Sequence, residues 1–235
     1  MLVLGIETAT QICGVAIVKG GNLLAEYRLN IKNAHARKLV GAIEKLWLDC
    51  GISVNDLNGI AVSIGPGSFT GLRIGVSTAK GLALANSLPI TGVSTLQALA
   101  AQAPIRNGLV CPVIRSRANE VYAALYERVD FQDKLVEEVA VLTLEAFSGF
   151  APKGATIVGE PAELMQPLAS QQDYYIVPKE FSLLSAFTVA RIGYEQISAG
   201  QVADLATLEP MYFQEFIASK PKKTPALLGE DDGDS

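Results

Sequence analysis

The same order of expected strands and helices occurs twice along this chain, and this repeat is the strongest constraint on its fold. Hydrophobic alternation and helical periodicity predict three strands, then a helix, a strand, a helix, a strand and a helix, in each half. In the first half these elements are expected at 2–8, 14–19, 23–29, 35–49, 60–64, 72–85, 89–93 and 95–102. In the second half they are expected at 109–114, 120–127, 134–142, 144–150, 155–158, 162–169, 174–177 and 183–196.

Three hairpin-linked strands followed by strand–helix units predict a mixed sheet with helices on its faces. Two copies predict an α/β fold of two tandem β-β-β-α-β-α-β-α subdomains with a cleft between them. This is the layout of the actin/hexokinase/Hsp70 ATPase-like (ribonuclease H-like) class. We expect an N-terminal subdomain at 1–104 and a C-terminal subdomain at 105–219 whose last helix packs back. Residues 220–235, which end in acidic side chains, are expected to form a disordered tail.

Composition and charge exclude several classes of function. The 235 residues are 49% hydrophobic, but no apolar run reaches the roughly 18 residues that a membrane span needs. The N-terminus lacks the basic start of a signal peptide, so we expect a cytoplasmic protein with no membrane partner. A net charge of −5 argues against a general electrostatic grip on nucleic acid. The single histidine, His35, excludes a metal site built on paired histidines, and the three cysteines form no CxxC pair.

A glycine-rich turn at 65–71 joins an apolar strand to a helical pattern, an arrangement that can direct backbone N–H groups at an anion. The turn has neither the GxxxxGK[ST] nor the GxGxxG spacing of the common nucleotide loops. The alternative is that the glycines only permit a tight turn and close packing, and the residues favour neither interpretation. The candidates for an anion-binding or nucleotide-binding remnant are Glu7, Thr8, Gly65, Gly67, Ser68 and Thr70.

The helix expected after this turn carries a stripe of small residues. Gly71, Gly75, Ala79 and Ala83 are four positions apart and therefore share one helix face. A glycine inside a helix costs about 1 kcal/mol relative to alanine, so a close contact should compensate. That contact is either the protein's own sheet or a partner chain.

Five stretches of the chain form a recognisable set. They are GPGSFTGLRIG at 65–75, LGIETAT at 4–10, the helix that begins at His35, EVY at 120–122 and EPMY at 209–212. Together they resemble the TsaB (YeaZ) family, bacterial subunits of the tRNA threonylcarbamoyladenosine machinery, over nearly the whole chain. The chain departs from the family pattern at Arg115, where the segment before EVY lacks an acidic residue, at Pro161 and at Gln214.

The resemblance implies a non-catalytic subunit that dimerises with the related catalytic protein TsaD. With TsaD and the ATPase TsaE, such a subunit supports transfer of threonylcarbamoyl to adenosine 37 of tRNAs that read ANN codons. The resemblance further implies no tightly bound cofactor, ATP or ADP only within the complex, and a homodimer when the partner is absent. The implied partner surface lies on the two long first-half helices and comprises Leu39, Ile43, Leu46, Trp47, Gly71, Leu72, Gly75, Ala79 and Ala83.

A self-sufficient ATP-binding kinase or ATPase with the same two-subdomain layout is the alternative. Such an enzyme is expected to have a second phosphate loop that contains glycine and an aspartate. The equivalent stretch, residues 115–119, contains neither. A metallopeptidase is disfavoured by the single histidine and the missing HExxH motif.

Overall fold

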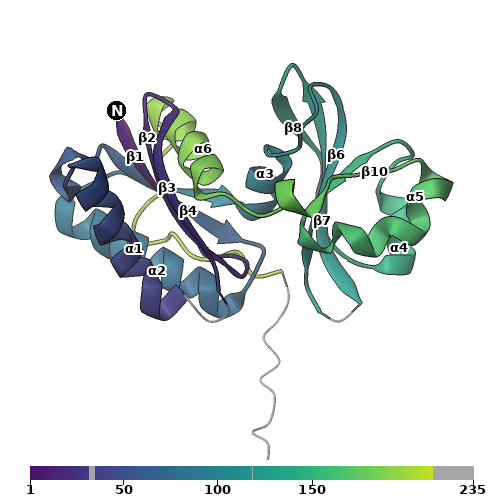
Figure 1. Cartoon of the computed structure of the whole chain (residues 1–235), viewed down its shortest axis with the longest axis horizontal. Coiled ribbons are helices and arrows are strands. Elements are labelled where there is room, and N and C mark those ends of the chain that lie inside the picture. The colour runs from purple at the N-terminus through teal and green to yellow at the C-terminus, as the bar shows by residue number, and fades with distance from the viewer. Residues whose placement is uncertain (32–34, 118, 214–235) are drawn as a thin grey trace, which may run out of the picture.

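Two lobes, each built on a five-stranded sheet, make up the computed structural model, which describes residues 1–31, 35–117 and 119–213 (Figure 1). The first sheet has the strand order β3-β2-β1-β4-β5, and the second has the order β10-β9-β6-β7-β8. In each sheet the first three strands pair antiparallel, and the remaining two run parallel to the first. The second half thus repeats the topology of the first, and the predicted α/β fold of two tandem units is confirmed.

The strands and helices occur in the predicted order. The strands are β1 (Leu2–Glu7), β2 (Ile12–Lys19), β3 (Asn22–Asn30), β4 (Gly59–Gly65), β5 (Ile90–Ser94), β6 (Gly108–Arg115), β7 (Glu120–Val129), β8 (Gln132–Thr143), β9 (Thr156–Val158) and β10 (Tyr175–Ile176). The helices are α1 (His35–Cys50), α2 (Phe69–Asn86), α3 (Thr95–Ala100), α4 (Leu144–Phe150), α5 (Gln166–Gln172) and α6 (Ala186–Ser198). Short 3-10 helices occupy Val54–Asp56, Glu160–Met165 and Lys179–Phe181.

Several helix boundaries differ from the predictions: α3 ends at Ala100 rather than at residue 102, and α6 spans Ala186–Ser198 rather than 183–196. Two further differences have a local cause. The helix expected at 162–169 is divided into the 3-10 helix Glu160–Met165 and α5, because Pro167 has no N–H to continue the first one. Helix α2 begins at Phe69 rather than at residue 72, because the Ser68 side chain caps it by accepting a hydrogen bond from Gly71 N. The glycine-rich turn is therefore shorter than the sequence indicates.

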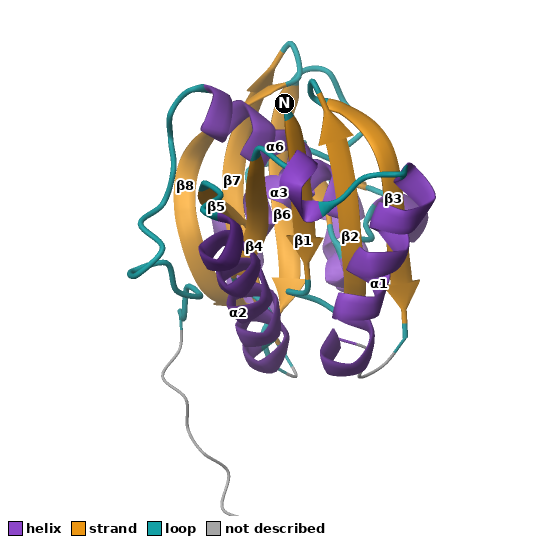
Figure 2. Ribbon diagram, turned by 90° about the vertical axis from the view of Figure 1, so that its left-hand side faces the viewer, coloured by secondary structure: helices purple, strands orange, loops and turns teal. Residues whose placement is uncertain are grey.

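Helices cover both faces of the first sheet. Figure 2 shows α1 and α2 side by side on the outer face, where they contact β2, β3 and β4. Helix α6, from the second half of the chain, packs on the other face against β1, β2, β4 and β5. Among the helices of the described residues, none has both the length and the apolar character of a bilayer span.

The two lobes share a core on one side. Helix α3 ends the first half of the chain but packs against β6 and β7 of the second sheet, and α6 lies beside it (Figure 1). One continuous apolar cluster runs from Val3 and Ala61 in the first lobe to Val110 and Tyr126 in the second. The lobes are therefore held together by packed side chains and by the connections of the chain.

The chain returns to the first lobe after α6. Residues 199–213, here named the C-terminal strap, run beside β5, β4 and α2. Ala203 N donates to Ile90 O at 2.8 Å, and Met211 N donates to Ile64 O at 2.7 Å. Lys80 of α2 donates from Nζ to Leu208 O at 3.0 Å. The tail predicted at 220–235 and the family departure at Gln214 lie outside the described residues.

Candidate functional site

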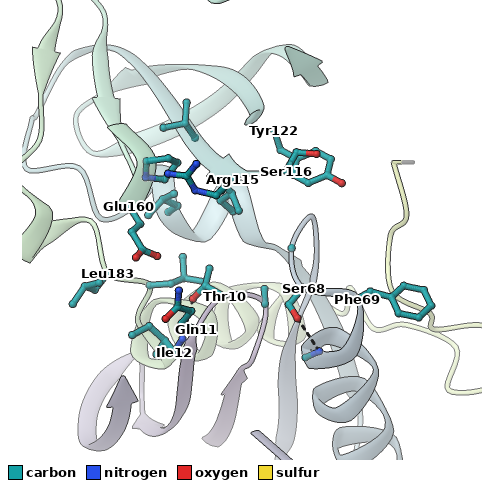
Figure 3. A pocket seen from close by; sticks show the side chains of 18 of the residues that line it. Thr10, Gln11, Ile12, Ser68, Phe69, Arg115, Ser116, Tyr122, Glu160 and Leu183 are labelled. Carbon is teal, nitrogen blue, oxygen red and sulfur yellow. Dashed lines mark hydrogen bonds between the residues drawn. The ribbon is translucent and has the colours of Figure 1, made fainter. Parts of the chain in front are cut away.

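A cleft of about 670 Å³ opens between the lobes (Figure 3). Its first-lobe wall is formed by the turn between β1 and β2 at 9–12 and by the starts of α1 and α2. Its second-lobe wall is formed by the end of β6, Tyr122 of β7, part of the 3-10 helix Glu160–Met165 and residues 182–184. The volume lies within the range of about 300–1000 Å³ that is typical of small-molecule sites.

The glycine turn before α2 is closed onto the β1–β2 turn. Ser68 N donates to Ala9 O at 2.6 Å, and a Cβ at Gly67 would overlap the Ala9 carbonyl. Gly71 N donates to Ser68 Oγ at 3.2 Å. Two of the N–H groups that an anion would need at this helix start are thus donated within the chain.

The small face of α2 lies directly on the end of β1. A Cβ at Gly71 would overlap Thr8 O, and a Cβ at Gly75 would overlap Thr8 Oγ1. Ala79 and Ala83 continue the stripe and are fully buried. The sequence allowed this stripe to contact either the protein's own sheet or a partner chain. In the structure it packs on the protein's own sheet.

The six candidates for an anion-binding remnant come together only in part. Gly67, Ser68 and Thr70 line the cleft. The others, Glu7, Thr8 and Gly65, are buried and are not among the lining residues. Anion or nucleotide binding at these residues stays a prediction.

Glu7 is a carboxyl with incomplete hydrogen bonding. Its side chain is fully buried, and Oε1 accepts a hydrogen bond from Ala9 N at 2.6 Å, while Oε2 has no partner among the described residues. Burial raises the pKa of Glu7 from 4.5 to about 7, although hydrogen bonds from Ala9 and Ser63 act in the opposite direction. In residues 1–31, 35–117 and 119–213, no three His, Cys, Asp or Glu side chains gather as a metal site.

The cleft walls carry polar groups that could hold a ligand. The Nε2 atom of His35, at the start of α1, lies 2.9 Å from Ile12 O. Because a carbonyl oxygen can only accept a hydrogen bond, Nε2 is the donor. Figure 3 shows Arg115 and Glu160 on the second-lobe wall, facing Thr10 of the first lobe. Within the described part of the chain, His35 forms no hydrogen bond with a serine or cysteine, so these residues form no Ser–His or Cys–His pair.

The residues that the sequence assigned to a partner surface belong to the core instead. Those that are buried against the first sheet or the β1–β2 turn are Leu39, Ile43, Leu46, Gly71, Leu72, Gly75, Ala79 and Ala83, and Trp47 is half-buried. The reason is that the apolar face of an amphipathic helix packs on its own sheet. The outward faces of α1 and α2 carry Val40, Leu48 and Leu84, whose side chains are 58%, 80% and 72% exposed.

One group of residues at the edge of the cleft was not predicted from the sequence. Arg73 of α2 donates from Nε to the hydroxyl of Tyr212 in the strap at 3.0 Å, and its Cζ lies 3.8 Å from the ring centre of Phe69. Arg73 and Tyr212 are 139 positions apart, so no local pattern indicates their contact.

Comparisons with known proteins agree on one family. A family model described as "TsaD: tRNA N6-adenosine threonylcarbamoyltransferase" matches residues 22–230. The "tRNA threonylcarbamoyladenosine biosynthesis protein TsaB" of Escherichia coli strain K12 is 30% identical over 230 residues, which cover 94% of this chain and 97% of that protein. The protein of the same name from Bacillus subtilis strain 168 is 37% identical over 139 residues, which cover 59% of each chain.

Solved structures with the same fold come from Pseudomonas aeruginosa. "YeaZ from Pseudomonas aeruginosa" has a TM-score of 0.77 and 25% identity, and the match covers 90% of this chain and 100% of that one. A protein "with similarity to peptidase YEAZ" has a TM-score of 0.78 and 26% identity, covering 91% and 98% of the two chains.

Proposed function

Since the chain belongs to the TsaB (YeaZ) family, we propose that it takes part in the biosynthesis of threonylcarbamoyladenosine in tRNA. In this proposal the chain is a non-catalytic subunit that dimerises with a TsaD-like catalytic protein. The pair transfers threonylcarbamoyl to adenosine 37 of tRNAs that read ANN codons. A TsaE-like ATPase is the third component, and the assembly works in the cytoplasm.

The outward surface of α1 and α2 is the observation that carries the dimerisation. Val40 and Leu48 of α1 and Leu84 of α2 are large apolar side chains that stay exposed, and we name the surface around them the α1–α2 face. Gly41 and Gly81 lie on the same two helices, and a Cβ at either would meet nothing within 4 Å. Exposed apolar side chains interspersed with glycine allow a partner helix to approach closely.

The cleft supports the non-catalytic part of the proposal. Among the described residues, His35 has no nucleophile bonded to it, and no cluster of ligands is present that could hold a metal. Glu7 is a single buried carboxyl at the end of β1, and the N–H groups of Ser68 and Gly71 are already donated. We propose that the chain alone binds no cofactor tightly, and that ATP or ADP is held only in the complex.

A charged substitution on the α1–α2 face tests the dimerisation. Leu84→Asp should weaken binding to the TsaD-like chain of the same genome by about tenfold or more, because it places a carboxylate in an apolar interface. Val129→Asp is the matched control, because Val129 is also exposed (57%) but lies at the end of β7 in the second lobe. Isothermal titration calorimetry of the full chain measures both affinities, and light scattering shows whether the homodimer responds in the same way.

Two outcomes would contradict this proposal at different levels. Equal affinities of Leu84→Asp and the unsubstituted chain would exclude the α1–α2 face but leave the family role standing. A chain that does not associate with the TsaD-like protein at all would refute the role itself. The alternative, a self-sufficient kinase or ATPase with a nucleotide in the cleft, requires the isolated chain to bind ATP with Mg²⁺ in the same calorimeter.

A further inference from the structure

Aromatic rings and a guanidinium gather where α2 begins. The Arg73 guanidinium carbon lies 3.8 Å from the ring centre of Phe69 and 5.8 Å from that of Tyr212, and the two rings are 5.1 Å apart. The hydrogen bond from Arg73 Nε to the Tyr212 hydroxyl, at 3.0 Å, fixes the guanidinium. The cluster is therefore ordered by its own contacts while it remains at the surface.

The chemistry of this cluster is planar and cationic. Arg73 is exposed and forms no ion pair with a carboxylate of the described residues, so its charge is not neutralised within the described part of the chain. The Tyr212 side chain is 46% exposed although it makes two aromatic or cationic contacts. An exposed aromatic ring beside a guanidinium whose position is fixed offers stacking surfaces together with a positive charge.

The opposite lobe contributes a third ring. Tyr122 of β7 lines the cleft, and its ring centre lies 6.2 Å from that of Phe213 at the end of the strap. Figure 3 shows Tyr122 and Phe69 at the same end of the cleft, one on each lobe. We name the set of Phe69, Arg73, Tyr122, Tyr212 and Phe213 the aromatic mouth.

We propose that the aromatic mouth binds unpaired bases of an RNA strand. Proteins that recognise single-stranded RNA stack its bases on aromatic rings and on arginine planes. With a net charge of −5, the chain has no general attraction for phosphates, so stacking must supply most of the affinity. The inference rests on the proposed function, because tRNA modification is what brings an RNA to this protein.

Binding of short RNAs to the full chain tests the proposal by fluorescence anisotropy. We expect an RNA stem-loop with an unpaired loop to bind more tightly than a blunt duplex of the same base composition. Tyr212→Ala should weaken stem-loop binding by about 5- to 150-fold, the usual effect of removing one stacking ring. Tyr212→Phe keeps the ring but loses the hydrogen bond that fixes Arg73, so it should weaken binding clearly less than Tyr212→Ala. Arg73→Lys should lose most of what Arg73→Ala loses, since lysine keeps the charge but has no plane.

Arg106→Ala is the matched control, because it removes the same charge far from the aromatic mouth. Arg106 precedes β6 and pairs with Asp130, which follows the end of β7, whereas Tyr122 lies near the start of β7. Thermal melts of each variant establish that it is folded. Equal affinity for stem-loop and duplex, or a loss for Arg106→Ala as large as for Arg73→Ala, would overturn the stacking role. Loss of TsaD-like binding without loss of RNA binding would instead make the mouth a protein interface. Such results leave the family role untouched if the unsubstituted chain still binds the TsaD-like protein.

Discussion

Gly75 and Gly81 lie in the same helix, and replacing each by alanine separates packing from helix propensity. Alanine is favoured over glycine inside a helix by about 1 kcal/mol, and this gain applies at both positions. At Gly81 nothing lies within 4 Å of the added Cβ, so the whole gain remains. We expect Gly81→Ala to raise the free energy of unfolding by about 1 kcal/mol.

At Gly75 the same change forces α2 away from β1. The added Cβ overlaps Thr8 Oγ1, and Thr8 is fully buried, so its side chain has little room to turn away. Overpacking of a tight core costs about 1–3 kcal/mol, and an overlap with a fixed side chain belongs at the upper end. After the propensity gain is subtracted, we expect Gly75→Ala to lower the free energy of unfolding by about 2 kcal/mol, which places the two variants about 3 kcal/mol apart.

Urea unfolding followed by the fluorescence of the single tryptophan measures both variants. In thermal melts the expected separation corresponds to about 2–4 °C for each kcal/mol at this chain length. A second substitution, Thr8→Ala, removes the atom that is overlapped, so it should restore much of the stability that Gly75→Ala loses. The packing argument is refuted if Gly75→Ala is as stable as Gly81→Ala, or if Thr8→Ala brings no recovery.

Two buried charged groups lead to further expectations. The folded-state pKa of Glu7, about 7, lies above its ordinary value of 4.5, so the stability linked to its proton is present at low pH and lost as the pH rises through about 7. The difference in unfolding free energy between Glu7→Gln and the unsubstituted chain should therefore shift by about 3 kcal/mol in favour of Glu7→Gln from about pH 4 to about pH 8. If urea unfolding shows the same difference at both pH values, this expectation is wrong. Arg128 is buried, and its guanidinium donates to both carboxylate oxygens of Asp133 at 2.7 Å and to three carbonyl oxygens at and after the end of α3. Arg128→Met should cost about 3–5 kcal/mol because it leaves the buried carboxylate unpaired, whereas Arg106→Met in an exposed pair should cost less than about 1 kcal/mol; similar losses in urea titrations would contradict the argument.

The order of elements could be predicted because it depends on local periodicity. Runs of apolar and β-branched residues predict strands such as β2 and β7. Two adjacent glycines predict the turn at Lys19–Asn22. The errors arose where one residue overrides the periodicity. Pro167 divides the helix expected at 162–169, and Ser68 starts α2 earlier than the glycines suggest.

The site was less predictable because it depends on residues far apart in sequence. Periodicity shows that Gly71 and Gly75 share a face, but it does not show that Thr8 is what this face meets. The same limit explains why core residues such as Leu39 were assigned to a partner surface: an apolar stripe has the same pattern whichever surface covers it. The contact of Arg73 with Tyr212 depends on the return of the strap, which no spacing encodes.

Both proposed binding surfaces include side chains of α2: Leu84 in one, Phe69 and Arg73 in the other. The inner face of α2 is held by Thr8 and Ala9, and its outer flank is held by the strap through Lys80 and Arg73. The α1–α2 face and the aromatic mouth therefore share one support, although they use different side chains. A change that loosens this support, such as Gly75→Ala, should weaken protein and RNA binding together, whereas Leu84→Asp and Tyr212→Ala should each affect only one. If Gly75→Ala weakens only one of the two interactions, α2 is not their common support.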